Sequence, residues 1–196
     1  IGDKFINKDN VALILGDNFF YGQSLSLKLK ESTKLTRGAK VFLHKVSKPE
    51  LYGVAKINKK KRIIKIVEKP KKFISDYAIT GLYFFDNNVV KYAKSLKPSK
   101  RGEIEIIDLL EKYKKRKKLN ADFIGRGGTW LDTGSIEDFY NTSNFVSTIE
   151  NRQGFKIACL EEIAFMNKWI SKKEMINSIK FYGNCEYSNY LKKIIM

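Results

Sequence analysis

The sequence contains few of the residues on which several common enzyme chemistries depend. Among its 196 residues are two cysteines, Cys159 and Cys185, one histidine, His44, and three prolines. Two cysteines are too few for a disulfide framework, and neither has a zinc-ligand spacing with His44 or with the other cysteine. We therefore expect no zinc site and neither Ser-His nor Cys-His catalysis. His44 lies in an extended pattern over 40–46, and we expect it to face solvent from a strand.

Long hydrophobic runs are also missing. No window holds the roughly 18 consecutive apolar residues that a membrane-spanning helix needs. Residues 1–4, Ile-Gly-Asp-Lys, lack the charged and apolar regions of a signal peptide. We therefore expect a cytoplasmic protein without a membrane partner. With 43% hydrophobic residues, the chain is long enough for one domain with a sizeable core.

Negative charge is scarce relative to positive charge. Lys and Arg number 38, Asp and Glu 21, and the formal net charge is +17. Such an excess suits polyanions, because basic side chains release counterions from phosphates. A nucleic-acid platform would interleave basic and aromatic residues, whereas the aromatic residues at 83–85 lie in a strand pattern that indicates core. We expect no nucleic-acid partner, and the positive field favours small anionic substrates.

The order of apolar patterns predicts an α/β fold with a mixed sheet flanked by helices. The continuous apolar run 11–15 predicts a strand buried on both faces of a parallel sheet, and the helix and strand after it predict a βαβ crossover. We expect a single domain over 1–196 in which 135–196 is mainly helical. The further strands are expected at 40–46, 53–57, 63–67, 77–85 and 121–124, and the helices at 25–34, 88–95, 104–115, from Ser135 to Gly154, after Ser171 and around Tyr190.

Two acidic residues at strand ends are the main candidates for chemistry. Asp17 follows the first apolar strand in a Gly-Asp-Asn sequence, and Asp132 stands in Trp-Leu-Asp-Thr-Gly at 130–134. Ligands of open α/β sheets gather beyond the carboxyl ends of strands, where two carboxylates can share one Mg²⁺. On pattern alone, the simpler interpretation of each residue as a solvated turn or loop residue stays open.

Three short motifs carry groups suited to a sugar phosphate. In Glu-Lys-Pro at 68–70, the Glu68 carboxylate can accept hydrogen bonds from hydroxyls while the Lys69 ammonium binds a phosphate. Tyr52 and Gly53 open a hairpin, where glycine permits close approach of the backbone to a ligand. Arg101 precedes a helix and can bind a phosphate. A surface ion pair, an ordinary turn and a solvated guanidinium are the respective alternatives.

The order of these motifs along the chain is more specific than any one of them alone. Taken together, they closely resemble the glucose-1-phosphate thymidylyltransferase (dTDP-glucose synthase) family, in one register from Ile1 nearly to the C-terminus. The motifs are Leu-Gly-Asp-Asn-Phe-Phe-Tyr-Gly at 15–22, Tyr-Gly-Val at 52–54, Glu-Lys-Pro at 68–70, Ile-Thr-Gly-Leu-Tyr-Phe-Phe-Asp at 79–86, Arg-Gly-Glu-Ile-Glu-Ile at 101–106, Trp-Leu-Asp-Thr-Gly at 130–134 and Glu-Glu-Ile-Ala-Phe at 161–165.

The resemblance implies a nucleotidyltransferase fold, Rossmann-like and similar to GT-A, and a Mg²⁺-dependent transfer of dTMP from dTTP to glucose 1-phosphate. It implies that Asp17 and Asp132 hold Mg²⁺, that Glu68 binds glucose hydroxyls, and that Lys69 and Arg101 bind phosphates. It also implies a homotetramer that serves dTDP-deoxysugar pathways such as dTDP-rhamnose and polysaccharide biosynthesis. The catalytic set would be Asp17, Lys69, Arg101 and Asp132, and the substrate-binding set Tyr52, Gly53, Glu68, Lys69, Ile79 and Arg101.

The chain departs from the family pattern at its start. Family members begin with a strand and a Gly-rich loop that carries an Arg, followed by base-reading residues. All of these elements precede the position in the family pattern that Ile1 matches. We expect a fold that is incomplete at the N-terminus, with an unpaired sheet edge, and a chain that is inactive alone. Another sugar-1-phosphate nucleotidyltransferase, for example one using UTP, is the alternative within this class. A non-catalytic remnant or a basic binding module is the alternative outside it.

Overall fold

In the computed structural model, which describes residues 2–99 and 102–196, the apolar run 77–85 forms the central strand β6 (Tyr77–Phe85). Strand β3 (Ala39–Lys45) pairs antiparallel along one side of β6, and β1 (Val11–Ile14) and β4 (Gly53–Ile57) pair antiparallel with the other. Strand β5 (Ile63–Glu68) extends the sheet beyond β4, and β7 (Leu119–Phe123) runs parallel to β3. The predicted mixed sheet is therefore confirmed.

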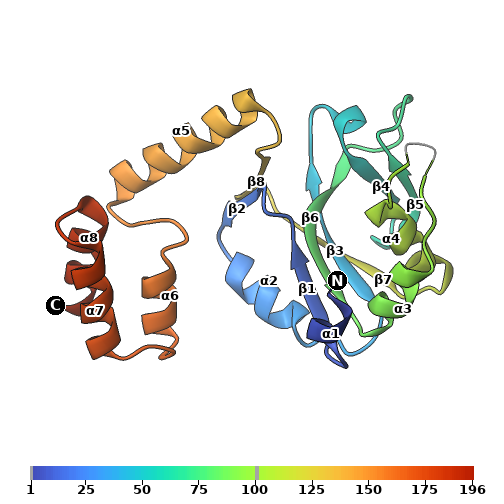
Figure 1. Ribbon diagram of the computed structural model, residues 1–196. Coiled ribbons are helices and arrows are strands. Elements are labelled where there is room, and N and C mark those ends of the chain that lie inside the picture. The colour runs from blue at the N-terminus through green and yellow to red at the C-terminus, as the bar shows by residue number, and fades with distance from the viewer. Residues whose placement is uncertain (1, 100–101) are drawn as a thin grey trace. The chain divides into compact units, whose positions relative to one another are not determined.

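Helices cover both faces of this sheet, as Figure 1 shows. Successive strand residues point to opposite faces, so Val41 packs in one cluster of buried side chains and Phe42 in another. The first cluster includes residues of α3 (Asn88–Lys94) and α4 (Ile106–Lys115). The second is packed against Leu29 of α2 (Leu25–Ser32). The α/β class follows from this two-sided burial.

Strand β1 differs from its prediction. It pairs antiparallel with β6, and no second strand pairs with it among the described residues. Leu13, Ile14 and Leu15 consequently keep 36%, 57% and 41% of their surface exposed, so the prediction of a strand buried on both faces in a parallel sheet is wrong. This is the expected unpaired edge. Because β1 and β3 are both antiparallel to β6, they run parallel to each other, and the predicted crossover through α2 is present with β6 between its strands.

A second, two-stranded sheet was not predicted. It pairs β2 (Asn18–Gly22) antiparallel with β8 (Gly128–Asp132), two segments distant in sequence. The strands approach closely, since a Cβ at Gly22 would lie 2.6 Å from the Cα of Gly128. Gly-Asp-Asn and Asp-Thr-Gly have the chemistry of turns, so only the long-range pairing reveals that strands begin and end there.

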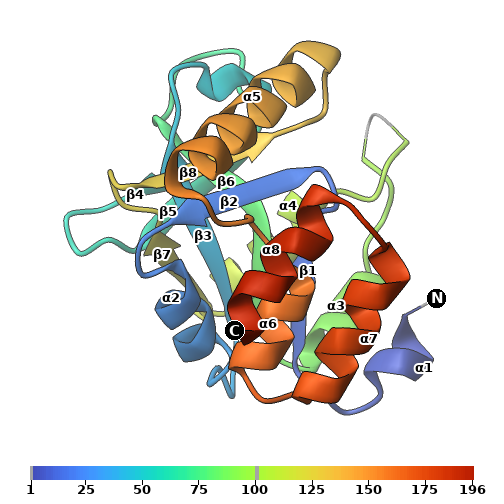
Figure 2. The ribbon, with the colours of Figure 1, turned by 90° about the vertical axis from the view of Figure 1, so that its left-hand side faces the viewer.

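The chain divides into two compact units, Ile1–Gly134 and Ser135–Met196. The first also contains the short helix α1 (Asp3–Ile6) and the 3₁₀ turn Pro49–Leu51. The second consists of helices, drawn in orange to red in Figure 2. These are α5 (Ile136–Gln153), α6 (Leu160–Met166), α7 (Lys172–Tyr182) and α8 (Glu186–Ile195). Whether the two units form one domain stays a prediction.

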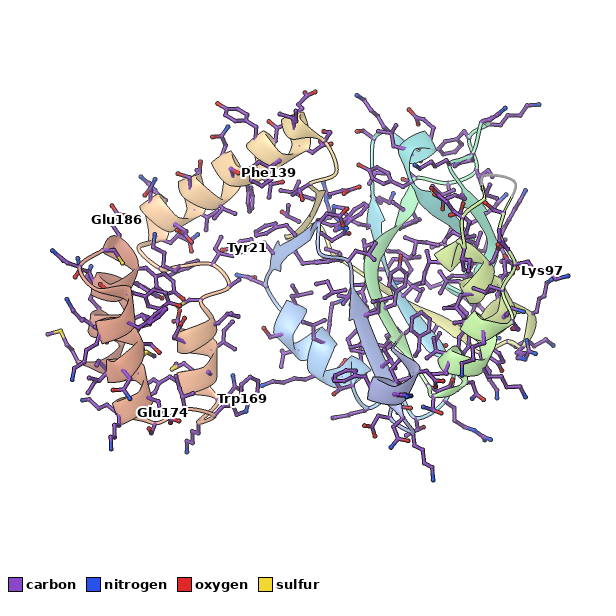
Figure 3. All side chains as sticks on the ribbon, viewed as in Figure 1. Tyr21, Lys97, Phe139, Trp169, Glu174 and Glu186 are labelled. Atoms are coloured by element: carbon purple, nitrogen blue, oxygen red, sulfur yellow. The ribbon has the colours of Figure 1, made fainter. Side chains whose placement is uncertain are left out.

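Both ends of α5 and the start of α7 lie where the sequence predicts, whereas α6 was not predicted. The Ser135 hydroxyl accepts a hydrogen bond from the Asp138 amide at the start of α5, and Gly154 ends that helix in the left-handed conformation. Ser171 and Glu174 form a capping box at the start of α7. Phe139 of α5 and Glu174 of α7 are labelled in Figure 3. No helix in the described part of the chain combines the length and apolarity needed to cross a membrane.

Candidate active site

A cavity of about 200 Å³ lies where the β2–β8 ribbon meets the main sheet. Its walls come from β2, β4, β5, β6 and β8 and from the start of α4, so segments distant in sequence converge on it. Six residues predicted for substrate or metal binding line the cavity. They are Tyr52, Gly53, Glu68, Lys69, Ile79 and Asp132.

Glu68 owes its place in the cavity to the β4–β5 hairpin. It ends β5 directly opposite Gly53 in β4. A Cβ at position 53 would lie 2.8 Å from the Glu68 carboxylate oxygen Oε2 and 2.8 Å from Cδ1 of Ile107. The glycine therefore leaves the room in which the carboxylate lies, which gives a steric reason for the Tyr-Gly-Val sequence.

Lys69 follows at a sharp bend. Its φ of 38° is in the left-handed region, which lysine adopts rarely, and its backbone amide donates to the Tyr52 carbonyl at 3.0 Å. The bend ends the strand, and the buried Pro70 follows it. Lys69 is exposed and lines the cavity together with Glu68, so its ammonium can meet an anionic group there.

Aromatic side chains form one wall. The rings of Tyr52 and Trp130 meet edge to face, with centroids 5.0 Å apart. The His44 ring lies edge-on to Trp130 at 6.4 Å, and its Nδ1 is buried without a hydrogen-bond partner among the described residues. Burial lowers the pKa of His44, and a hydrogen bond to the Ile124 backbone opposes that shift. The prediction of a solvent-facing histidine is therefore wrong, because the unpredicted β8 brings Trp130 against it.

The two predicted metal ligands belong to neighbouring segments: Asp17 stands in the turn directly before β2, and Asp132 is the last residue of β8. Asn18 pairs with Asp132 across the β2–β8 ribbon, and both the amide and the hydroxyl of Thr133 donate to the Asp17 carbonyl at 2.8 Å. Asp17 is exposed, and Asp132 is half-buried at the cavity. Mg²⁺ prefers oxygen ligands and is usually held by one or two carboxylates together with substrate phosphates. The two side chains supply carboxylate ligands of that kind. No cluster of three His, Cys, Asp or Glu suited to a metal occurs among the described residues.

Several cavity residues were not singled out from the sequence. Asn18, Trp130, Tyr83 and Ile107 all line it. Tyr83 was assigned to the core, and it is indeed buried; burial, aided by the nearby Glu68 charge, raises the pKa of its hydroxyl well above its usual value. Asn18, Tyr83 and Trp130 stand inside the ordered motifs, which is the signal that could have found them, whereas Ile107 directly follows the motif at 101–106. Arg101, the remaining predicted site residue, lies outside the described residues.

Comparisons with known proteins agree with this geometry. The family model "Nucleotidyl transferase" matches residues 1–149. A glucose-1-phosphate thymidylyltransferase of Neisseria meningitidis is 46% identical over 195 residues, which cover this whole chain and 68% of that protein. The protein of the same name from Mycobacterium tuberculosis is 37% identical over the whole chain and 67% of its own length.

Solved structures give the same picture. A Bacillus anthracis protein assigned as a glucose-1-phosphate thymidylyltransferase, crystallised with sucrose, matches with a TM-score of 0.66 and 40% identity, over 74% of this chain and 57% of that one. UDP-glucose pyrophosphorylase with UDP-glucose matches with a TM-score of 0.63 and 27% identity, over 75% of this chain and 59% of the other.

The chain thus spans about two thirds of the length of these curated relatives and less of the two solved structures. The family model covers most of this chain, and the match to the Neisseria protein covers all of this chain. On this evidence the chain belongs to the nucleotidyl transferase family and, within it, to the glucose-1-phosphate thymidylyltransferases.

Proposed function

We propose that this chain supplies the sugar-phosphate and metal side of a glucose-1-phosphate thymidylyltransferase, which transfers dTMP from dTTP to glucose 1-phosphate with Mg²⁺ and releases pyrophosphate. One observation carries the proposal. Glu68, Lys69 and Asp132 line one cavity, and Asp17 stands in the turn before β2, the strand that pairs with β8. Carboxylate, ammonium and paired acidic oxygens are the groups that hydroxyls, a phosphate and a divalent ion require.

Each residue has a distinct part in this proposal. Glu68 accepts hydrogen bonds from glucose hydroxyls, in the room left by Gly53. Lys69 attracts the sugar phosphate, with Arg101 as the second cation. Asp17 and Asp132 would hold Mg²⁺, which when bound neutralises charge on the phosphates. The wall of Tyr52 and Trp130 shields one side of the cavity from water and thereby strengthens the polar contacts within it. The homotetramer stays a prediction.

Titration calorimetry of the isolated chain with glucose 1-phosphate and Mg²⁺ tests the proposal, because all the groups that carry it belong to the sugar-phosphate and metal side. Heat of binding at a single site is expected for glucose 1-phosphate and not for inorganic phosphate at the same concentration. The same titration with dTTP checks the expectation that the chain alone does not bind nucleotide productively. If the isolated chain did not bind glucose 1-phosphate, the proposal would be wrong.

Changing Glu68 to Gln is expected to weaken glucose 1-phosphate binding roughly 5- to 30-fold. A charged acceptor forms hydrogen bonds to hydroxyls that are worth about 1–2 kcal/mol more than those of a neutral amide. Calorimetry on the variant measures this loss. Glu50→Gln, which changes an exposed glutamate after β3, is the matched control and should bind as the parent chain does.

Changing Gly53 to Ala is expected to weaken the same binding about tenfold. The new methyl group would contact Glu68 Oε2 and Ile107 at 2.8 Å, and moving both costs roughly 1–2 kcal/mol. Gly127→Ala is the control, because no atom lies within 4 Å of its Cβ position. Equal affinities of the two variants would mean that Glu68 does not contact the sugar.

The alternative within the class is a nucleotidyltransferase that uses UTP. The similarity to UDP-glucose pyrophosphorylase, at 27% identity, favours it to some degree. The 46% identity to a thymidylyltransferase along the whole chain favours the dTTP-using function more strongly.

A further inference from the structure

One side-chain amide joins three strands at the edge of the cavity. Asn18, the first residue of β2, accepts with its Oδ1 from the Gly81 backbone amide of β6 at 3.0 Å and from the Trp130 indole of β8 at 2.6 Å. Its Nδ2 donates to Oδ1 of the Asp17 carboxylate at 2.8 Å. Asn18 thus contacts the Asp17 carboxylate, the strand β8 that carries Asp132, and the central strand β6.

These contacts determine which way the Asn18 amide points. A backbone amide and an indole nitrogen can only donate, so the atom between them must be the amide oxygen. The amide nitrogen is then directed to Asp17, where only an acceptor can meet it. Because one end of the amide is held by two donors from two different strands, rotation to release Asp17 would leave both donors without their acceptor.

The glycine at position 81 of β6 leaves space for the Asn18 amide. A Cβ at Gly81 would lie 2.5 Å from Asn18 Oδ1, so any other residue at this place in β6 would displace the side chain. Gly81 lies inside a buried strand, where glycine costs backbone entropy. The close approach of Asn18 supplies the physical reason for glycine at this position.

We propose that Asn18 is the positioning residue of the acidic pair. Its Nδ2 fixes the Asp17 carboxylate in the orientation that binds a divalent ion, and its Oδ1 ties that carboxylate to Trp130, two residues before Asp132. This role rests on the proposed function, since it concerns the metal that Asp17 and Asp132 would share. Partners that orient a metal ligand typically change metal affinity by about 10- to 100-fold when removed.

The experiment compares Asn18→Ala with the parent chain by Mn²⁺ titration, because carboxylates bind Mn²⁺ much as they bind Mg²⁺. We expect Asn18→Ala to bind Mn²⁺ about 10- to 100-fold more weakly. Asn120→Ala, which changes an exposed asparagine in β7, should bind as the parent does. Trp130→Phe keeps the Asp17 contact and should lose less than Asn18→Ala. Unchanged Mn²⁺ affinity in Asn18→Ala would overturn the proposal.

A second measurement separates this inference from the proposed function. In ¹⁵N spectra, Asp17→Ala should shift the side-chain amide signals of Asn18, and Asn18→Ala should shift the indole N–H signal of Trp130. If the parent chain binds no Mn²⁺, the proposed metal site fails, and these signals still report whether Asn18 holds Asp17. Asn18 amide signals that do not respond to Asp17→Ala would overturn the positioning role, whatever the chain binds.

Discussion

Changing Asp17 and Asp132 together to asparagine is expected to weaken Mn²⁺ binding on the order of 1000-fold. Each substitution removes one negative ligand, and this loss should exceed the roughly 10- to 100-fold typical of partners that only orient a ligand. The turn that holds Asp17 is joined to the end of β8, where Asp132 lies, by the hydrogen bonds from Thr133 to the Asp17 carbonyl. Mn²⁺ titration followed by electron paramagnetic resonance measures the loss directly, without requiring catalytic turnover.

A matched control separates ligand loss from a change in overall charge. Asp9→Asn with Glu31→Gln removes the same two negative charges at exposed positions outside the cavity. On a chain of net charge +17, general attraction of a cation is weak, so this variant should bind Mn²⁺ as the parent does. Similar losses in both double variants would show that the acidic pair is not a metal site.

The sequence predicted those elements of the fold whose signals are local. The alternating pattern of 53–57 and 63–67 and the apolar run 77–85 correspond to β4, β5 and β6. The cap at Ser135 and the glycine at 154 mark both ends of α5. Period, caps and turn residues act within a few residues of the chain, so their consequences can be seen without the tertiary structure.

The features that sequence reasoning missed depend on contacts between distant segments. Strands β2 and β8 exist because they pair with each other, and their sequences alone indicate turns. His44 is partly buried because β8 brings Trp130 against it. Strand β1 is antiparallel to β6, a direction that an apolar run does not specify. In each case the tertiary partner decided the outcome.

The candidate site shows the same division. Asp17, Glu68 and Asp132 were identified because a carboxylate at a strand end has a recognisable chemistry. Asn18 and Gly81 were not identified from the sequence, because their importance comes from the contact that they make with each other between the two sheets. All the ordered motifs except the one at 161–165 contribute at least one described residue to the cavity, whereas the geometry was needed to show which of their residues support the others.

Replacing Asp86 with alanine is expected to destabilise the first unit by roughly 3–5 kcal/mol. Asp86 directly follows β6 and is only 4% exposed. Its carboxylate accepts from the Gly38 amide at 2.6 Å, the Tyr113 hydroxyl at 2.8 Å and the Asn88 amide at 3.1 Å. Removing it leaves three donors without an acceptor in or near the core, and each such loss costs about 1–3 kcal/mol. Guanidinium unfolding of the variant measures the change.

The same carboxylate makes a pH-dependent contribution to stability. Burial raises the pKa of Asp86, but the hydrogen bonds from Gly38, Tyr113 and Asn88 outweigh burial and leave the pKa below its usual value of 3.8. A carboxyl whose pKa is lower in the folded than in the unfolded state stabilises the fold fully above its unfolded pKa. That contribution is lost as the pH falls below about 3.8 and through the folded pKa.

Asp86→Asn isolates this effect, because the amide retains the shape of the side chain and does not titrate in acid. The difference in unfolding free energy between the parent and Asp86→Asn should be constant from about pH 7 to pH 5 and should shrink as the pH falls from about 4 to 3. Asp108→Asn, at an exposed residue in the first turn of α4, should change stability by less than about 1 kcal/mol. A difference that stayed constant into acid would mean that the three donors do not hold the Asp86 carboxylate ionised, and the junction of β6, α3 and α4 would then owe its stability to apolar packing around Tyr113 alone.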